Sequence, residues 1–437
     1  MNRVVMVIGG GGRESVLVEK YSLSPHVSKI IAISGNDLMQ FVSKKPLITF
    51  PNIKTTDKNE ILKICRLQKV DLIDVSRDDT VAAGVSDLLR KNKFSVLGPS
   101  KKAGKIEWSK IYSRKLLKKI NIPQPEFKVF DSQKHGIEYL KSQKEQQWFV
   151  KADGLAGGKG AMPAKNNNEA ISAIKSLRQF GRSGEKFLLE KWIKNNNQIA
   201  EEFSAFALSD GKSFKILGYA QDHKRANDGD TGENTGGMGA SFPPLLIDKN
   251  IEDQVDKIFE KTFAELLKRK TPYVGVLFLG GILIGKKVYV IEFNARWGDP
   301  EGQVIVPSIQ NDFYELGAAV ATGKLNNISL KIFKTPRVCV AVAPHGYPIS
   351  KKHIGEEIIG VLKFLKNKDT KIYGAGIKFQ DKKLVTTGGR ALHVVGEGKN
   401  IKEAREKAYN VINKIIKEGN KLHYRSDIGW RDIRRLK

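Results

Sequence analysis

The sequence contains very little cysteine and no hydrophobic run long enough to span a membrane. Its two cysteines, Cys65 and Cys339, stand far apart, and no CxxC pair or Cys/His cluster surrounds either of them. The composition therefore predicts neither a disulfide framework nor a structural zinc site. No apolar stretch approaches the roughly 20 residues of a membrane-spanning helix, and the N-terminus lacks the basic-then-apolar order of a signal peptide. We expect a soluble, cytoplasmic protein with no membrane partner.

Acidic residues are also scarce relative to basic ones. The chain has 75 lysines and arginines against 47 aspartates and glutamates, which gives a formal net charge of +28. Such a charge attracts polyanions, so a nucleic-acid partner is one hypothesis. Against it, the basic residues are spread along the chain and form no single tract interleaved with aromatics. Solvated surface is the favoured interpretation, and nucleic acid is the less favoured partner.

The chain is too long for one ordinary core. Its 437 residues, 40% of them hydrophobic, are enough for several globular cores. The usual size of a domain predicts about three folding units. From softer stretches near 98–104 and 324–336, we place the units at residues 1–102, 103–328 and 329–437. The sequence shows no internal repeat and does not indicate an oligomeric state.

Strands alternate with helices in the first unit, which predicts a doubly wound α/β domain. Apolar strands are expected at residues 3–8, 29–34 and 71–76. Gly9 to Gly12 follow the first strand, before a helical pattern from Arg13 to Leu23. Such a turn places free backbone N–H groups at a helix N-terminus, a seat for phosphate. The second strand ends without the acidic residue that a dinucleotide ribose needs, so nicotinamide and flavin cofactors are disfavoured.

A glycine-rich loop follows a buried strand in the stretch WFVKADGLAGGKGA, residues 148–161. The strand ends in Lys151, and the loop contains Gly154, Gly157, Gly158 and Gly160. Glycines let backbone amides approach phosphate oxygens, and a lysine supplies a point charge. The loop is not a Walker A motif, because it lacks that motif's first glycine and its Ser or Thr after the lysine. A plain flexible turn would explain the glycines but not the lysines, so we predict phosphate binding.

Two further stretches of the second unit carry weaker signals. A single helix is expected over 103–119, ended by the prolines of NIPQP. The apolar strand FLLEKWI, residues 187–193, carries Glu190. A strand edge beside one carboxylate can read an adenine amino group, although any strand with a surface glutamate looks the same.

The stretch QDHKRANDGDTGENTGGMGA, residues 221–240, is nearly devoid of apolar residues and rich in glycine. We expect a long irregular loop, and such a loop inside a compact domain is more often functional than a linker. Asp222, His223, Lys224 and Arg225 suit a polar, anionic substrate. An amphipathic helix is expected at 252–268 and strands at 274–284 and 287–293.

The stretch VIEFNARWGDPEGQ, residues 290–303, runs from an apolar strand into charged and amide groups. Alternation at period two puts Glu292 and Asn294 on one face of the strand. A carboxylate and an amide oxygen on one face are a half-site for a hard divalent cation. The alternative is a strand end with a solvated polar face.

The third unit is expected to be a small α+β domain. Its pattern predicts strands at RVCVAVA and ALHVVGEG, a glycine turn at 386–390, and a helix from Ile401 to Lys417 ended by Gly419.

Taken in order, these stretches resemble the phosphoribosylamine–glycine ligase family of the ATP-grasp superfamily. The matching segments are VIGGGGRES, FVKADGLAGGKGA, QDHKRANDGDTGENTGGMGA, VIEFNARWGDPE, HGYP, TTGGRAL and YRSDIGWR. The resemblance implies an N-terminal α/β domain, an ATP-grasp centre of two lobes that clamp ATP, and a C-terminal domain. It also implies a reaction in which ATP activates glycine to an acyl phosphate, which the amine of 5-phosphoribosylamine attacks.

The resemblance further implies roles for particular residues. Catalytic roles go to Arg296, Asp222 and Lys224. Glu292 and Asn294 are expected to hold magnesium or manganese on the ATP phosphates. Nucleotide contacts are expected from Lys110, Lys151, Gly154, Gly157, Gly158, Gly160, Glu190, Lys191 and Ile193. Substrate contacts are expected from Gly10, Gly11, Gly12, Arg13, Asp78 and Asp299.

Several positions depart from the family's usual pattern. The family has His at Ser15, Gly-Pro-Glu at Ser76 to Asp78 and Pro at Thr80, and the segments SGNDLMQ and GAGI also differ. Several of these fall in the N-terminal domain, which in the family helps to hold the phosphoribosyl amine. A paralogous ATP-grasp ligase for another amine or acid therefore stays open. A nucleotide-binding or nucleic-acid-binding protein without catalysis is disfavoured, because it needs no phosphoryl-transfer residues.

Overall fold

The first unit is a parallel sheet buried on both faces. The computed structural model describes residues 2–156, 160–193, 200–367 and 369–436. The sheet has the order β3-β2-β1-β4-β5, and all its pairs are parallel. Its strands are β1 (Arg3–Ile8), β2 (Val27–Ile33), β3 (Leu47–Phe50), β4 (Leu72–Val75) and β5 (Ser95–Leu97). The helices between them are α1 (Gly12–Ser22), α2 (Met39–Val42), α3 (Lys58–Leu67), α4 (Asp78–Ala83) and α5 (Val85–Lys91).

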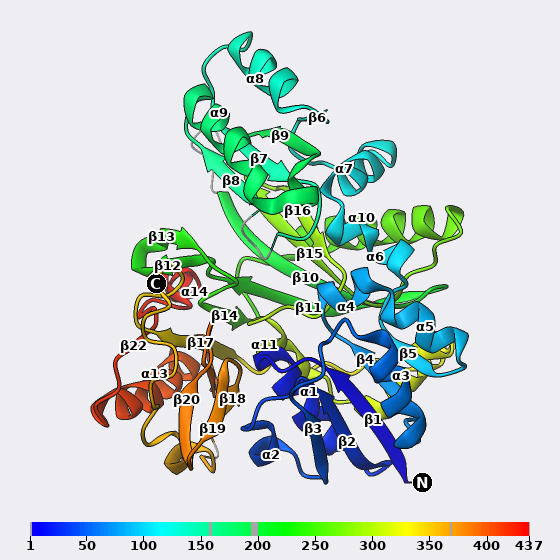
Figure 1. Ribbon diagram of the computed structural model, residues 1–437, viewed down its shortest axis with the longest axis vertical. Helices are drawn as coiled ribbons and strands as arrows, with labels where there is room; N and C mark the ends of the chain where they lie inside the picture. The colour runs from blue at the N-terminus through cyan, green and yellow to red at the C-terminus, as the bar shows by residue number, and fades with distance from the viewer. Residues whose placement is uncertain (1, 157–159, 194–199, 368, 437) are drawn as a thin grey trace.

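Strand β1 shows why this sheet needs helices on both sides. Val5 and Val7 belong to one hydrophobic cluster, while Val4, Met6 and Ile8 belong to another. Successive side chains of a strand point to opposite faces, so each face must be covered. The doubly wound α/β domain expected from the sequence is confirmed (Figure 1).

The single helix expected over 103–119 is wrong, because the chain forms two helices there. These are α6 (Lys101–Trp108) and α7 (Lys110–Lys119). Ser109 stands between them in an extended conformation, and its side chain accepts a hydrogen bond from the Tyr112 N–H. A serine at this position satisfies a free N–H group of the second helix and so favours a new start.

A four-stranded antiparallel sheet forms the first lobe of the centre, which stands at the top of the molecule in Figure 1. Its order is β6-β9-β7-β8, and it has its own hydrophobic core. The elements are β6 (Phe127–Phe130), α8 (Gln133–Lys141), β7 (Trp148–Ala152), β8 (Ala161–Ala164), α9 (Asn167–Ser176), η1 (Leu177–Gly184) and β9 (Phe187–Lys191). The strand expected at 187–193 therefore ends two residues early.

A nine-stranded antiparallel sheet runs through the second lobe into the C-terminal part. Its order is β16-β15-β10-β11-β14-β17-β21-β18, with β22 paired to β17. The strands are β10 (Ala200–Asp210), β11 (Phe214–Asp222), β14 (Gly239–Phe242), β15 (Val274–Ile284), β16 (Lys287–Asn294), β17 (Arg337–Pro344), β18 (Thr370–Gly374), β21 (Leu392–Glu397) and β22 (Leu422–His423). Because β14 pairs with β17, the sheet continues across the limit placed at residues 328 and 329. The three unit limits therefore stay a proposal.

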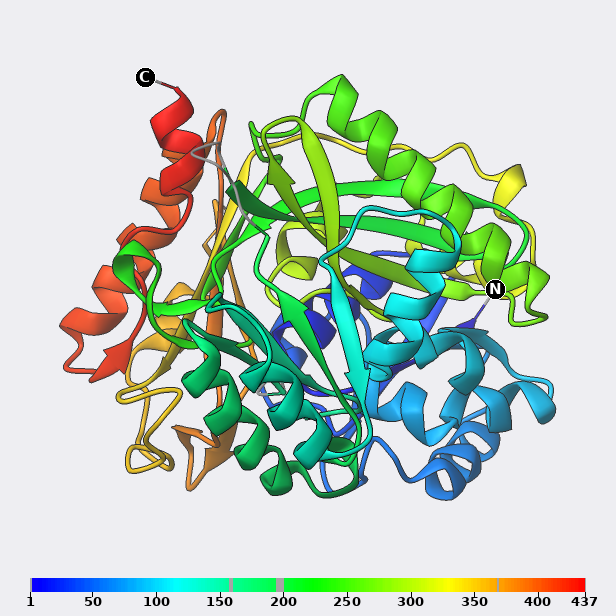
Figure 2. The same ribbon diagram turned by 90° about the horizontal axis from the view of Figure 1, so that it is seen from above.

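The remaining elements cover this sheet or connect its strands. They are α10 (Lys249–Lys268), α11 (Gly302–Ile305), η3 (Val306–Ser308), α12 (Phe313–Ala321), η4 (Leu325–Asn327), η5 (Val361–Phe364), β19 (Ile377–Gln380), β20 (Lys383–Thr386), α13 (Ile401–Lys417) and α14 (Trp430–Arg435). Figure 2 shows α13 and α14 on the opposite side of the molecule from α10. No helix within the described ranges is long and apolar enough to cross a membrane.

The long irregular loop expected at 221–240 is also wrong. The stretch forms a β-hairpin, β12 (Arg225–Asn227) and β13 (Thr231–Asn234), joined by η2 (Asp228–Asp230), and then enters β14. The C-terminal segment holds the hairpin in place. Buried Arg425 donates to Asp230 Oδ1 at 2.8 Å, and Asp427 Oδ2 accepts from the Gly229 N–H at 2.9 Å. Polar contacts with the C-terminal segment therefore help to order the hairpin.

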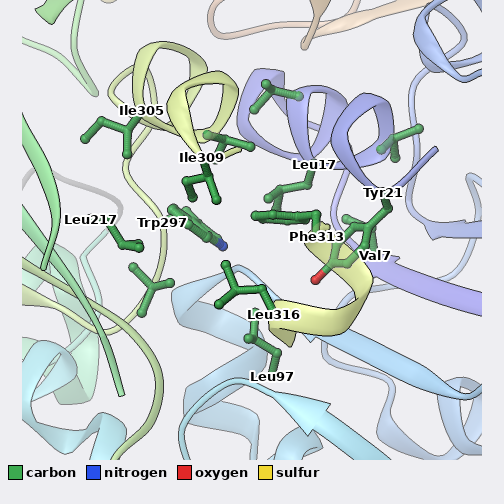
Figure 3. Close-up of a cluster of buried hydrophobic side chains, with 14 of the residues drawn as sticks. Val7, Leu17, Tyr21, Leu97, Leu217, Trp297, Ile305, Ile309, Phe313 and Leu316 are labelled. Carbon is green, nitrogen blue, oxygen red and sulfur yellow. The ribbon is translucent and has the colours of Figure 1, made fainter. Parts of the chain in front are cut away.

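One hydrophobic cluster joins the first unit to the centre (Figure 3). Tyr21 of α1 and Phe313 of α12 meet edge to face with 4.7 Å between ring centroids. Trp297, which follows β16, lies beside Phe313 in the same cluster. This packing holds α1 and α12 against the segment after β16 that carries Trp297.

Candidate active site

A pocket lies between the first lobe and the edge of the nine-stranded sheet, where β7 and β9 face β16 in Figure 1. Its lining comes from α6, α7, β7, β9 and β16. The residues are Ile106, Glu107, Lys110, Ser113, Arg114, Lys151, Glu190, Ile291, Glu292 and Phe293. Four of the nucleotide and metal residues expected from the sequence, Lys110, Lys151, Glu190 and Glu292, thus share one pocket.

A buried ion cluster occupies the side of the pocket nearest the first lobe. Lys151 Nζ lies 2.6 Å from Glu190 Oε2, and Arg114 Nε donates to Glu190 Oε1 at 2.6 Å. All three side chains are buried. Burial alone would raise the pKa of Glu190, but Arg114 and Lys151 hold that pKa below its ordinary value. Burial lowers the pKa of Lys151.

The loop after Lys151 is tied to the start of α7. Asp153 Oδ1 accepts hydrogen bonds from Ser109 Oγ at 2.9 Å and from the Ile111 N–H at 3.0 Å. The first turn of α7, which carries Lys110, is therefore fixed to the glycine-rich loop. Gly154 has a φ of +151°, which favours glycine, and the Gly160 carbonyl accepts from the Ala152 N–H at 2.8 Å. Gly157 and Gly158 lie outside the described residues.

The expected adenine hinge follows β9. Lys191 is the last residue of this strand, and its N–H donates to the Glu126 carbonyl at 2.9 Å. Trp192 comes next and stacks on Phe149 with 4.6 Å between ring centroids. Ile193 is partly buried. An aromatic pair therefore stands beside the chain that is expected to read the base.

The end of β16 brings the expected metal and catalytic residues together. Asn294 Nδ2 donates to Glu292 Oε1 at 3.4 Å, so the two side chains share one face. Arg296 Nη2 donates to Asn294 Oδ1 at 3.1 Å. Lys110 Nζ lies 3.9 Å from Glu292 Oε2. Burial would raise the pKa of Glu292, but Lys110, Lys224 and Lys151 lower it to about 2, so this carboxylate is ionised at neutral pH.

Glu107 of α6 orients the segment after β16. Its Oε2 accepts from the Ala295 N–H at 2.8 Å, and its Oε1 lies 3.3 Å from Arg296 Nε. Burial raises the pKa of Glu107 to about 7, despite the opposing charge of Arg296. Asp78, at the start of α4, is close enough to raise the pKa of Arg296 further. The charge of the expected substrate residue Asp78 is therefore felt by the expected catalytic arginine.

Lys224, which follows β11, lies among several carboxylates. Lys224 Nζ lies 2.9 Å from Glu202 Oε2 and 4.0 Å from Asp222 Oδ2. Burial raises the pKa of Asp222. Burial, and then the charge of Asp222, raise the pKa of Glu301 to about 7. The cluster can hold a cation such as an ammonium group and can accept a proton.

The glycine turn after β1 differs from the expected row of free amides. The Gly9 N–H donates to the Ile33 carbonyl at 2.9 Å, and the Gly11 N–H donates to Glu14 Oε2 at 2.7 Å. Arg13 is buried, and its guanidinium donates to Glu14 Oε1 and to the Trp297 carbonyl. The expectation that Gly9 and Gly11 offer free N–H groups is therefore wrong, because the sheet and the Glu14 carboxylate already use them.

Asp299 marks the point where three parts of the chain meet. Arg390 Nη2 lies 3.2 Å from Asp299 Oδ2, and His393 Nε2 lies 3.4 Å from Asp299 Oδ1. A Cβ atom at Gly11 would lie 3.3 Å from Asp299 Oδ2, and one at Gly12 would lie 2.2 Å from His393 Nδ1. The glycine turn, the segment after β16 and the strand β21 thus converge on one carboxylate.

Sequence profiles of phosphoribosylglycinamide synthetase match three successive parts of the chain. The N domain matches residues 3–107, the ATP-grasp (A) domain matches 108–302, and the C domain matches 337–431. The chain belongs to the phosphoribosylglycinamide synthetase family. A phosphoribosylamine–glycine ligase from Caldanaerobacter subterraneus is 36% identical over 431 residues, covering 97% of this chain and 99% of that protein.

Solved structures of other proteins share the fold of this chain. A phosphoribosylamine–glycine ligase from Thermotoga maritima has a TM-score of 0.77 and 28% identity, covering 97% of this chain and 99% of that one. The biotin carboxylase domain of the Hydrogenobacter thermophilus 2-oxoglutarate carboxylase, in complex with MgADP, has a TM-score of 0.71 at 15% identity. This second structure, from outside the family, shares the ATP-grasp fold of the chain.

Three of the departures from the family's pattern meet in one buried cluster. Ser15 Oγ donates to the Gly374 carbonyl at 2.7 Å. Asn36 Nδ2 lies 2.9 Å from both Ser15 Oγ and the Gly374 carbonyl. Ser15, the segment SGNDLMQ and the segment GAGI are therefore in contact, and they lie behind the glycine turn, whose Gly10 carbonyl accepts from Asn36 at 2.9 Å.

Sequence reasoning missed several residues of this site. They are Arg114, Glu107, Glu202, Glu301, Arg390 and His393. A local signal existed for Arg114, which stands one helical turn after Lys110 in a basic helix and is expected on the same face. The other residues join the site through contacts with residues far apart in the sequence, and no local pattern predicts these contacts.

Proposed function

We propose that the chain joins glycine to 5-phosphoribosylamine at the expense of ATP, giving glycinamide ribonucleotide, ADP and phosphate. A carboxylate oxygen of glycine attacks the γ-phosphorus, and the bond to ADP breaks. The amine then attacks the acyl carbon, the carbon–oxygen bond to phosphate breaks, and the amine loses a proton. Family membership and the arrangement of charged groups around the pocket support this reaction.

The residues of the pocket fit a nucleotide with a divalent cation. Glu292 and Asn294 present an ionised carboxylate and an amide oxygen on one face. Groups of three or more metal-binding side chains do not occur among the described residues, so phosphate and water oxygens would complete the coordination. Such sparse coordination suits Mg²⁺, or Mn²⁺ in its place. The bound cation would offset charge on the phosphate oxygens.

The protein's own cations support phosphoryl transfer. Lys110 and Lys151 line the pocket, with Lys110 3.9 Å from Glu292 and Lys151 directed at Glu190. We assign both to the phosphates, and the hinge of Glu190, Lys191 and Ile193 to adenine. Arg296, held by Glu107, is assigned to the charge that develops on the transferring group.

The acidic cluster and the glycine turn are assigned to the other two substrates. Lys224 would pair with the glycine carboxylate, while Asp222, whose pKa burial raises, is assigned as acceptor of the amine's proton. Asp299 and Asp78 would contact the phosphoribosyl amine. In the glycine turn, Gly10, Gly12 and Arg13 are assigned to the phosphoribosyl amine through their backbone N–H groups. The Gly11 N–H already donates to Glu14, so Gly11 is assigned only to letting the substrate come close to the backbone.

One observation carries the proposal. Glu292, Asn294 and Arg296 form a connected row at the end of β16, beside the lysines of a pocket between two lobes. The test is ADP release by purified protein with freshly generated phosphoribosylamine and with a panel of other amines and small acids. Release that requires both glycine and phosphoribosylamine supports the proposal. Faster release with an unphosphorylated amine or another acid would favour a paralogous ligase.

A further inference from the structure

Arg114 contacts both lobes of the pocket, and none of the roles assigned above uses it. The side chain is only 3% exposed. It stands on α7 one helical turn after Lys110, so the two side chains leave the helix on the same face. Both line the pocket, which places the Arg114 guanidinium within the nucleotide site.

Toward the first lobe, Arg114 fixes the carboxylate of the expected adenine hinge. Its Nε donates to Glu190 Oε1 at 2.6 Å, while Lys151 Nζ lies 2.6 Å from Glu190 Oε2. Both carboxylate oxygens are therefore engaged. If Lys151 turns to a phosphate, Arg114 still holds Glu190 in place.

Toward the second lobe, the same guanidinium holds the strand that carries the metal residues. Its Nη1 donates to the Val290 carbonyl at 2.8 Å, and its Nη2 donates to the Ile291 carbonyl at 2.5 Å. In the strand order of the described residues β16 is the edge strand of its sheet, so the outer side of its backbone has no neighbouring strand. Arg114 supplies the donors that a further strand would otherwise provide.

The contact falls on an irregularity in β16. Glu292 pairs with Gly280 and Val290 pairs with Gly281, so Ile291 is the extra residue of a β-bulge. A bulge changes the direction of the side chains that follow it. The direction of Glu292 into the pocket therefore depends on the backbone that Arg114 holds.

We propose that Arg114 is a positioning residue that couples the adenine end of the site to its metal end. Its Nε sets Glu190, and its two terminal nitrogens set the bulge and thereby Glu292. A planar fork of five N–H donors can serve three acceptors on two strands, whereas a lysine offers one ammonium at one point. The proposal rests on the proposed function, since it needs a nucleotide and a cation in this pocket.

The test compares Arg114→Lys and Arg114→Met with Lys115→Met, which removes the charge of an exposed neighbour on the same helix. Calorimetry follows the binding of ADP and GDP over a range of Mg²⁺ concentrations and needs no catalytic turnover. We expect Lys115→Met to match the parent protein. Arg114→Lys should need about tenfold more Mg²⁺ for the same ADP affinity, as losses of ligand-orienting residues do. It should also lose preference for ADP over GDP.

The Mg²⁺ requirement and the base preference separate a positioning role from a structural one. Arg114→Met leaves the buried Glu190 with one cation fewer, and such variants can unfold. Arg114→Lys keeps the charge and decides the matter in that case. If it melts at a lower temperature but matches the parent in both readouts, the proposal is overturned. A parent protein that binds no ADP with Mg²⁺ overturns the proposed function as well.

Discussion

Lys151 points its ammonium group at Glu190, with 2.6 Å between Nζ and Oε2, inside a pocket where both are buried. Their assigned roles require contact with opposite ends of ATP. Binding of the triphosphate should therefore draw Lys151 away from Glu190, since a ligand shifts a protein toward the arrangement that it contacts best.

Replacing Lys151 by Met should lower kcat/KM for ATP by about a hundredfold, because one preorganised cation of the phosphoryl clamp is lost. Glu190 keeps Arg114 at 2.6 Å, and the melting temperature of the variant checks that it still folds. Steady-state kinetics with varied ATP measure the effect. Lys165→Met, an exposed change in the same lobe, is the control and should match the parent. Unchanged ATP kinetics in Lys151→Met would show that Lys151 does not bind the ATP phosphates.

Replacing Glu292 by Gln should reduce kcat by at least about a hundredfold and raise the Mg²⁺ concentration needed for half-maximal rate. The change keeps the shape of the side chain and removes the charge whose pKa lies near 2. Rates at limiting and saturating Mg²⁺ measure it, with the melting temperature as a check on folding. Normal activity at limiting Mg²⁺ would show that the metal assignment is wrong.

Replacing Gly12 by Ala should raise KM for phosphoribosylamine and leave KM for ATP nearly unchanged. The new Cβ would lie 2.2 Å from His393 Nδ1 and 2.7 Å from Gln303 Nε2, so the groups around Asp299 must move. Gly302→Ala is a matched control, since outside its own helix the nearest atom to its Cβ would be Arg13 Cγ at 3.7 Å, an ordinary contact distance. Equal KM values for the amine in both variants would show that this turn is not part of the amine site.

Replacing Asp74 by Asn should stabilise the protein at alkaline pH more than at acid pH. Asp74 is fully buried, and burial raises its pKa to about 7. An unfolded aspartate ionises near pH 4, so the parent's free energy of unfolding should fall as pH rises from about 4 to about 7 and then level. Asn carries no charge and removes this loss.

Urea unfolding of Asp74→Asn and of the parent at pH 5 and pH 8 checks the sign. The advantage of the variant over the parent should grow with pH. The hydrogen bond from Tyr21 to Asp74 Oδ2, 2.9 Å long, can be accepted by the amide oxygen. An advantage that is the same at both pH values would mean that Asp74 is already ionised in the folded protein at pH 5.

Uninterrupted hydrophobic patterns gave the most accurate predictions. The strand expected at 274–284 and the helix expected from Ile401 to Lys417 match β15 and α13. In each, local preference and burial favour the same structure. The break at Ser109 was missed although its signal is local, because a serine followed by a new helical turn is a helix start.

Structure created by distant polar contacts was not predictable from the pattern. The hairpin β12–β13 is held by Arg425, which lies 195 residues beyond Asp230, so its polar sequence resembled a loop. The N–H of Gly11 was expected to be free, but Glu14 occupies it, and a glutamate at the third helical position is itself a signal of such a cap. Arg114 reaches Glu190 and Val290, which are 76 and 176 residues away.

The most direct test of the account follows the oxygen atoms of glycine. Glycine labelled with heavy oxygen in its carboxylate is turned over with ATP and phosphoribosylamine, and the released phosphate is analysed by mass spectrometry. If the carboxylate attacks the γ-phosphorus and the amine then displaces phosphate, each phosphate must carry one labelled oxygen. Unlabelled phosphate, formed together with glycinamide ribonucleotide, would contradict an acyl-phosphate route. Release of ADP and unlabelled phosphate without glycinamide ribonucleotide would contradict the ligase activity itself.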